Sequence, residues 1–245
     1  MKILKEIVGR IWALWGLVSF ILTFLIIFIP SMIPYLIPDP KGQKVFIKIS
    51  KIWMTTWLYL VGCPLKVKGR ENFQKNTAYI VVCNHNSMLD IPVSCPFIPG
   101  ANKTIAKASF MKVPLFGWFY KKGAVLVDRK NEISRRKSFD AMKKVLAIGM
   151  HMSIYPEGTR NRTNEPLKKF HDGAFKLAVS SGNEIIPAVI FNTRKALPIN
   201  KKFFFLPYRL QMHFLQPVSV NGLTAEQLRE KIFVIMKDYY VQHQH

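Results

Sequence analysis

The chain has 245 residues, and 36 Lys and Arg against 14 Asp and Glu give it a formal net charge of +22. Hydrophobic residues make up 49% of the chain and charged residues 20%, which excludes a largely disordered protein because disordered chains are poor in apolar residues. A single uncharged run is long enough to cross a bilayer, which excludes a multi-pass membrane protein. So basic a chain attracts polyanions, including nucleic acid, anionic lipid headgroups, phosphorylated substrates and acidic carrier proteins.

The first element along the chain is an uncharged run of 19 residues, 11–29, which would form a helix about 28 Å long. It is longer than the apolar core of a signal peptide, and prolines follow it instead of a cleavage site. We therefore expect a membrane anchor that stays attached. Pro30, Pro34 and Pro38 should end this helix, since each lacks an amide proton.

A second helix is predicted from about residue 44, because its apolar side chains share one face and its lysines lie on the opposite face. The apolar face contains Phe46, Ile49, Trp53, Trp57 and Leu60. Lysines flank the first apolar run on both sides, so the positive-inside rule places both of its ends in the cytosol. This favours a re-entrant helical hairpin in one leaflet over a spanning helix, with Trp12, Trp15, Trp53 and Trp57 at headgroup depth. The alternative is that the helix at 46–62 simply packs on the soluble domain.

After residue 62, short apolar runs alternate with longer helical patterns. Strands are predicted at 65–68, 78–83, 104–107, 124–127, 152–155, 185–191 and 211–215, and helices near 88–95, 110–119, 131–149, 172–181 and 224–240. Ser134 is the predicted cap of the third helix. The alternation predicts an α/β fold with a largely parallel central sheet flanked by helices. The expected division is into membrane-anchoring helices at 1–62 and an α/β domain at 63–245.

Several common catalytic devices are missing from the sequence. The signatures of dinucleotide-binding, P-loop, serine-esterase and zinc-protease sites do not occur, and Cys63, Cys83 and Cys95 form no C-x-x-C pair. We expect these thiols to be buried and reduced in a cytosolic protein. The sequence NHNSMLD, at residues 84–90, comes directly after a predicted strand. His85 can take a proton from a hydroxyl at neutral pH if a carboxylate such as Asp90 fixes its tautomer.

Cations come directly after three other predicted strands. Lys107 ends one of them, Arg129 ends the sequence GAVLVDR, and Arg160 lies in YPEGTRNR. Because the carboxyl ends of parallel strands meet at one edge of a sheet, these side chains would converge there and could bind a phosphate. The alternative for the arginines is solvated surface charge.

Four motifs in this order resemble those of the glycerophospholipid acyltransferases, most closely the bacterial-type 1-acyl-sn-glycerol-3-phosphate acyltransferases. They are N-H-x-S-x-x-D at 84–90, G-x-[FIL]-x-[IV]-D-R at 123–129, P-E-G-T-R at 156–160, and an apolar strand with proline at 185–189. The resemblance covers about residues 60–220. Asn86 stands where glutamine is common in the family, and Asn161 stands where serine is common.

The resemblance implies transfer of a fatty acyl group from acyl-CoA or an acyl carrier protein to the sn-2 hydroxyl of 1-acyl-sn-glycerol-3-phosphate, giving phosphatidic acid. His85 would be the general base and Asp90 would hold it. The residues implied in acceptor binding are Lys107, Arg129, Glu157, Gly158, Thr159 and Arg160, with Glu157 and Gly158 shaping the loop. No metal and no cofactor are implied, because the acyl thioester is a co-substrate.

Lipid substrates leave a bilayer with difficulty, since each buried CH₂ is worth about 0.8 kcal/mol. We therefore expect the protein at the cytoplasmic face of the inner membrane, with the anionic lipid surface and the lysophospholipid as partners. Acyl carrier protein is a further candidate partner, and nucleic acid is not one, because no nucleic-acid motif occurs. Two alternatives stay open: the same fold acting on lyso-ornithine lipid or another lysophospholipid, and a basic peripheral membrane protein without catalysis.

Overall fold

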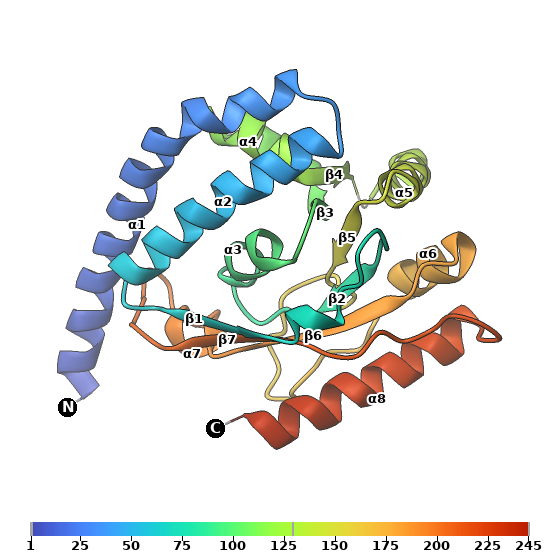
Figure 1. The fold of residues 1–245 in the computed structure, drawn as a ribbon. Coiled ribbons are helices and arrows are strands. Elements are labelled where there is room, and N and C mark those ends of the chain that lie inside the picture. Colours follow the sequence, from blue (N-terminus) through green and yellow to red (C-terminus); the bar gives the residue numbers. More distant parts are fainter. Residues whose placement is uncertain (1, 129, 245) are drawn as a thin grey trace.

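A computed structural model describes residues 2–128 and 130–244. Within these residues seven strands form one sheet in the order β1-β7-β6-β2-β5-β3-β4 (Figure 1). They are β1 Leu65–Lys68, β2 Ile80–Cys83, β3 Asn102–Lys107, β4 Ala124–Val127, β5 His151–Ile154, β6 Ile185–Phe191 and β7 Leu210–Phe214. Neighbouring strands are parallel except for the β6–β7 pair, so β1 and β7 run against the other five. The predicted largely parallel sheet is confirmed.

Helices cover both faces of this sheet. They are α1 Lys2–Met32, α2 Lys41–Leu60, α3 Asp90–Ser94, α4 Phe116–Gly123, α5 Glu132–Ala147, α6 Gly173–Ser181, α7 Thr193–Ala196 and α8 Ala225–His243. Short 3-10 turns lie at η1 Ile33–Leu36, η2 Arg70–Asn72, η3 Cys95–Phe97 and η4 Ala108–Lys112. In β2, Ile80 and Val82 face a core shared with α5, α6 and α8, and Val81 faces a second core shared with α1, α2 and α3. Burial on both faces is what a central parallel strand requires.

Two predicted helices differ from the structure in ways that have a local cause. The helix expected at 110–119 is interrupted, because Val113 is extended before Pro114, and α4 begins only at Phe116. The cap of α5 is Asn131 rather than Ser134: the Asn131 side chain accepts a hydrogen bond from the backbone N–H of Ser134 at 2.9 Å. Helix α7 was not predicted, and its four residues are too few for a helical period.

The N-terminal helices form an antiparallel hairpin on one side of the sheet (Figure 1). Helix α1 continues through Pro30 to Met32, and α2 already begins at Lys41, so both predicted boundaries were a few residues off. Because α2 packs against α1, η3 and α4, Trp53 and Trp57 are only 3% and 5% exposed. Their placement at headgroup depth was therefore wrong, and packing on the α/β domain describes α2.

The indoles of α2 find hydrogen-bond partners inside the protein. Trp53 Nε1 donates to Thr23 Oγ1 at 2.9 Å, and Trp57 Nε1 donates to the carbonyl of Gly16 at 3.1 Å. A buried indole needs such a partner, and α1 provides it. At the tip of the hairpin, Asp39 lies 3.0 Å from Lys103 Nζ and 2.9 Å from Lys122 Nζ. The hairpin is thus fixed to the start of β3 and the end of α4. The division of the chain at residue 62 stays a prediction.

The other face of α1 is apolar and exposed. Its exposed side chains include Ile3, Leu4, Ile7, Ile11, Leu14, Leu17, Leu22, Leu25, Ile26 and Ile29. Among the described residues, one helix, Ile3–Leu36, is long and apolar enough to cross a membrane. An apolar face of this size needs a cover of lipid or protein, since it is unusual on a soluble surface.

Candidate active site

His85 and Asp90 lie together where β2 ends. The Nδ1 atom of His85 is 2.8 Å from Asp90 Oδ2. An ionised carboxylate only accepts hydrogen bonds, so Nδ1 carries the proton and Nε2 keeps its lone pair. The His85 side chain is 15% exposed, whereas the Asp90 side chain is fully buried. The pair therefore has the geometry of a general base with its orienting carboxylate, as expected from the sequence.

Further donors fix the carboxylate of Asp90. Its Oδ2 also accepts the backbone N–H groups of Asn86 at 2.6 Å and Ser87 at 2.7 Å. Its Oδ1 accepts the hydroxyl of Thr193, the first residue of α7, at 2.6 Å. Sequence reasoning missed Thr193, which lies 103 residues from Asp90. The sequence does place Thr193 two residues after the predicted strand at 185–191, and this position could have indicated its role. Strands β2 and β6 are parallel neighbours, so they end at the same edge of the sheet.

A tyrosine packs against the imidazole. The rings of His85 and Tyr155 are 4.5 Å apart between centroids and inclined by 37°. The hydroxyls of Tyr155 and Ser94 are 2.6 Å apart, and burial raises the pKa of the phenol well above its ordinary value. Tyr155 is therefore neutral at physiological pH and supports the His85 ring through this contact.

Glu157, in the loop after β5, is completely buried beside the pair. Its Oε1 accepts the backbone N–H of His85 at 2.8 Å, and its Oε2 accepts the backbone N–H of Lys168 at 3.2 Å. Burial raises the pKa of Glu157 to about 7, although these two amide donors oppose the shift. Gly158 follows with φ of +70°, a conformation that favours glycine. The two residues thus lie at the turn of the loop that follows β5.

The same loop is bonded to His85 a second time. The backbone N–H of Asn161 donates to the carbonyl of His85 at 2.6 Å, so Glu157 and Asn161 hold both backbone groups of the histidine. Between these two contacts lie Thr159, whose hydroxyl accepts Lys168 Nζ at 2.8 Å, and the half-buried Arg160. The fold thus brings the loop of residues 155–172, which carries Arg160 and which we call the arginine loop, next to the candidate base. Sequence reasoning did not find the roles of Asn161 and Lys168, because their backbone N–H groups hold His85 and Glu157 and no residue type signals such a contact.

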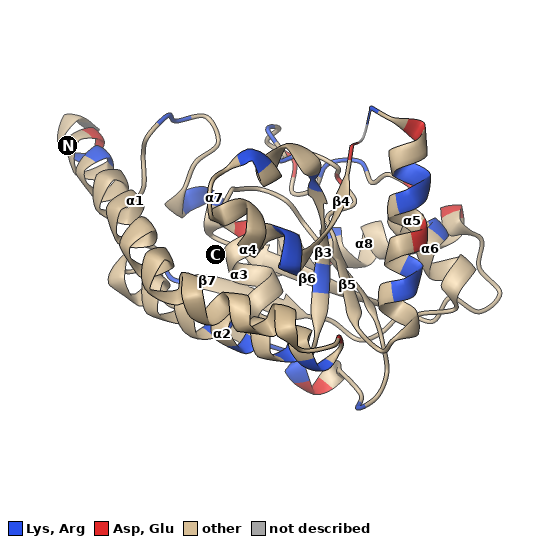
Figure 2. Ribbon diagram, turned by 90° about the horizontal axis from the view of Figure 1, so that it is seen from above, with Lys and Arg blue, Asp and Glu red and all other residues tan. Residues whose placement is uncertain are grey.

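Lys107, a second predicted cation, lies farther along the sheet edge. Lys107 is exposed at the carboxyl end of β3, which is separated from β2 by β5. At the usual strand spacing this is about 10 Å of backbone separation. Arg129 lies outside the described residues. Figure 2 shows Lys and Arg positions on many elements, including α5 and the loops around the sheet, with few acidic positions among them.

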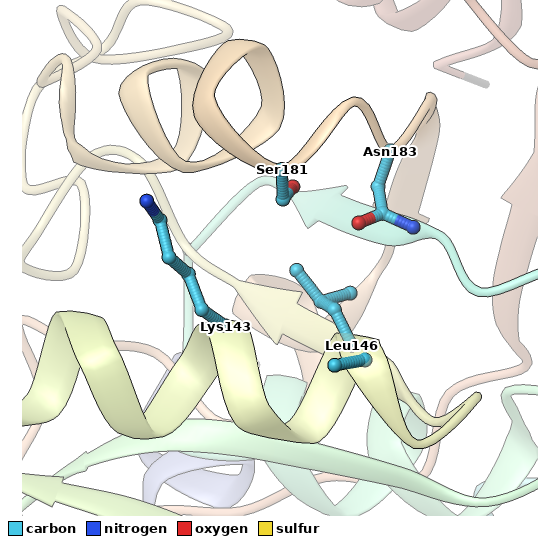
Figure 3. A pocket seen from close by; sticks show the side chains of 5 residues that line it. Lys143, Leu146, Ser181 and Asn183 are labelled. Carbon is cyan, nitrogen blue, oxygen red and sulfur yellow. The ribbon is translucent and has the colours of Figure 1, made fainter.

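One surface hollow lies apart from this constellation. It is formed by α5, the end of α6 and the segment after it, and its lining residues are Lys143, Leu146, Ala147, Ser181 and Asn183 (Figure 3). The Asn183 amide already donates to the carbonyl of Ala78 at 2.9 Å, and the Ser181 hydroxyl donates to that of Leu177 at 2.7 Å. These polar groups serve the fold, and the chemistry gathers around His85 instead.

The sequence profile of the acyltransferase family matches residues 64–191, which include all the site residues predicted from the sequence. This chain belongs to the acyltransferase family. It is therefore an enzyme, and the family recognised from the four motifs is confirmed. Among similar proteins, the 1-acyl-sn-glycerol-3-phosphate acyltransferase alpha of Mus musculus is 30% identical over 205 residues, which cover 78% of this chain and 70% of the relative.

Two more relatives of this acyltransferase carry the name 1-acyl-sn-glycerol-3-phosphate acyltransferase. The protein of Saccharomyces cerevisiae is 33% identical over 177 residues, covering 70% of this chain and 57% of the relative. That of Borreliella burgdorferi is 27% identical over 205 residues, covering 82% of this chain and 76% of the relative. The crystal structure of the 1-acyl-sn-glycerophosphate acyltransferase from Thermotoga maritima superposes with a TM-score of 0.80 at 24% identity and covers 96% of both chains. This likeness confirms the fold, the N-terminal hairpin included.

Proposed function

We propose that this acyltransferase moves a fatty acyl group from a thioester to the sn-2 hydroxyl of 1-acyl-sn-glycerol-3-phosphate, giving phosphatidic acid. The observation that carries the proposal is the His85–Asp90 pair, 2.8 Å apart, beside a loop that presents Arg160. The names of the mammalian, yeast and bacterial relatives support the same acceptor. The reaction serves phospholipid synthesis.

The proposed mechanism needs one base. Nε2 of His85 takes the proton of the acceptor hydroxyl while that oxygen attacks the thioester carbonyl. Asp90 stabilises the imidazolium that forms. When the tetrahedral intermediate collapses, the carbon–sulfur bond breaks and the proton passes from His85 to the departing thiolate. The products are the ester and a free thiol, so atoms and charges balance without a metal or a cofactor.

Cations at the sheet edge would bind the acceptor phosphate. Arg160 is held by its loop next to His85, and Lys107 lies along the same edge. Arg129 is a third candidate from the sequence pattern. The donor is acyl-CoA or an acylated carrier protein, and a net charge of +22 favours the phosphates of the first and the acidic surface of the second.

The apolar face of α1 supports a place at the membrane. Trp118 of α4 is 59% exposed and stacks on Phe28 of α1 with centroids 6.3 Å apart, so it continues that face. Lipid would cover both, with the hairpin inserted into one leaflet and the site at the cytoplasmic face of the inner membrane. A spanning α1 is the alternative, and protease access to an N-terminal tag in sealed vesicles separates the two.

The test is transfer of a labelled acyl group to lysophosphatidate in mixed micelles, from acyl-CoA and from acyl carrier protein. His85→Ala should lower kcat by about 10² to 10⁴, the range for loss of a general base, whereas His243→Ala at the far end of α8 should leave it unchanged. Full activity in His85→Ala would refute the mechanism. Absence of transfer by the wild type from either donor would refute the proposed acceptor.

A second acceptor class is tested by the arginine loop. Arg160→Ala should raise KM steeply for lysophosphatidate and little for a lyso-ornithine lipid, because only the first carries a phosphate monoester. Arg162→Ala, two residues on and exposed, is the matched control. An equal loss for both acceptors would rule out phosphate binding by Arg160, and better turnover of the ornithine lipid by wild type would favour that alternative.

A further inference from the structure

The end of β6 and the residues after it are bonded at three points to residues 84–90, which we call the catalytic loop. We define this segment, residues 190–197, as the β6–α7 turn. The Asn84 side chain accepts the backbone N–H of Ile190 at 2.7 Å and donates to its carbonyl at 3.0 Å. The Ser87 hydroxyl donates to the carbonyl of Leu197 at 2.9 Å. Between these contacts, the hydroxyl of Thr193 reaches Asp90. The turn therefore runs beside the catalytic loop along its length.

The contact between Thr193 and Asp90 differs from the others because it involves the reacting pair. Thr193 is 1% exposed and its Oγ1 is 2.6 Å from Asp90 Oδ1. His85 and two backbone amides hold Oδ2, and the Thr193 hydroxyl holds Oδ1, so this hydroxyl opposes rotation of the carboxylate about its Cβ–Cγ bond. Rotation would move Oδ2 away from the Nδ1 proton of His85.

The local backbone aims the hydroxyl in this direction. Asn192 adopts φ of +67°, a left-handed conformation that asparagine tolerates better than most residues, and its amide donates to the carbonyl of Arg209 at 2.9 Å. This reverses the chain after β6 and starts α7 at Thr193. From the next position, the guanidinium of Arg194 donates to the carbonyl of Thr163 at 2.6 Å, in the arginine loop.

We propose that Thr193 is a positioning residue for the catalytic pair and that the β6–α7 turn holds the catalytic loop and the arginine loop in one arrangement. The proposal rests on the proposed function of His85 as the base. Thr193 acts through Asp90 on kcat, because it touches only the orienting carboxylate. Arg194 acts through the loop that carries Arg160, and it therefore affects KM for the acceptor.

The test compares Thr193→Val with Thr193→Ser. Valine keeps the shape and removes the hydroxyl, so kcat should fall by roughly 10- to 100-fold, the range for a hydrogen bond to a charged group, with KM nearly unchanged. Serine should restore most of kcat. Thr104→Val is the matched control. Thr104, on β3, is also buried, and its hydroxyl donates to the backbone carbonyl of Ser153 at 3.1 Å. It should lower the melting temperature and leave kcat unchanged.

A second readout does not depend on turnover. The Nδ1 proton of His85 in ¹⁵N-histidine-labelled protein, assigned by its loss in His85→Ala, should shift in Thr193→Val and return in Thr193→Ser. Thr193→Ala serves if valine prevents folding. An unchanged resonance with unchanged kcat in a folded variant would overturn the proposal. If the resonance shifts in Thr193→Val but the wild type transfers no acyl group, the positioning role is upheld and the proposed function is rejected.

The arginine end of the turn has its own test. Arg194→Met keeps an unbranched aliphatic stem and removes the bond to Thr163, so KM for lysophosphatidate should rise several-fold with a smaller change in kcat. If Arg194→Met lowered only kcat, as Thr193→Val is expected to do, the assignment of Thr193 to kcat and of Arg194 to KM would be overturned.

Discussion

Glu157 offers a prediction whose size can be worked out from the structure. Its carboxyl group is completely buried and accepts two backbone amides, from His85 and Lys168. Burial raises its pKa from 4.5 to about 7, which means that the folded protein favours the protonated form. The stability this group confers is therefore full below about pH 4.5 and is lost as the pH rises through about 7. The difference corresponds to about 3 kcal/mol.

Glu157→Gln removes this dependence and introduces a second effect. One amide oxygen can still accept the N–H of His85, but the amide NH₂ then faces the N–H of Lys168, and two opposed donors cost about 1–3 kcal/mol. At low pH the variant should thus be less stable than the wild type. As the pH rises from about 5 to about 8, the free energy of unfolding of the wild type should fall by about 3 kcal/mol relative to that of the variant.

Urea denaturation of both proteins in the same detergent, monitored by tryptophan fluorescence across this pH range, measures the difference directly. Glu165→Gln, an exposed glutamate farther along the same loop, is the matched control and should keep a constant offset from the wild type. A difference between wild type and Glu157→Gln that does not change with pH would refute the argument that burial dominates at this carboxyl group.

Three further predictions concern the pair, the hairpin tip and the membrane face. Asp90→Asn should lower kcat by at least about 10², because its amide cannot accept all three donors at Oδ2; steady-state kinetics with unchanged melting would check this. Burial alone would raise the pKa of Asp39, but its two lysine partners hold it below the ordinary value, so its contribution to stability is lost as the pH falls. Asp39→Asn, which leaves the nearly buried Lys122 without its counter-charge, should cost about 3 kcal/mol in denaturant titrations above pH 5. Trp118→Ser should weaken binding to anionic vesicles about tenfold in sedimentation while leaving turnover of a soluble short-chain acceptor unchanged; equal binding would remove Trp118 from the membrane face.

Local sequence was sufficient for most of the strands. Those at 65–68, 124–127 and 185–191 have the predicted bounds, because each is a short apolar or β-branched run between turn residues. The order and direction of the strands could not be obtained in this way. No local pattern distinguishes β7, which runs antiparallel beside β6, from the parallel strands. The pairing of β1 with β7 depends on contacts between segments more than 140 residues apart in the chain.

The hairpin shows where a periodic pattern becomes ambiguous. Phe46, Trp53 and Trp57 of the predicted apolar face are buried, whereas Leu60 is exposed. An apolar stripe has the same spacing whether it meets lipid or protein. Only the packing of α1 over α2 decided that Trp53 and Trp57 bury their indoles inside the protein. The exposed apolar surface lies instead on α1, which has apolar residues all round and so can meet protein on one face and lipid on the other.

By itself the sequence determined the family, the α/β class, and the pairing of His85 with Asp90, because these depend on residue types at short, fixed spacings. The tertiary structure decided which groups hold that pair. Thr193 reaches Asp90, and Glu157 and Asn161 hold the backbone of His85, across sequence separations of 72 residues and more. Such contacts join strands that are neighbours only in the folded sheet, and a buried hydroxyl or carboxylate has no periodic pattern in the sequence that would reveal its partner.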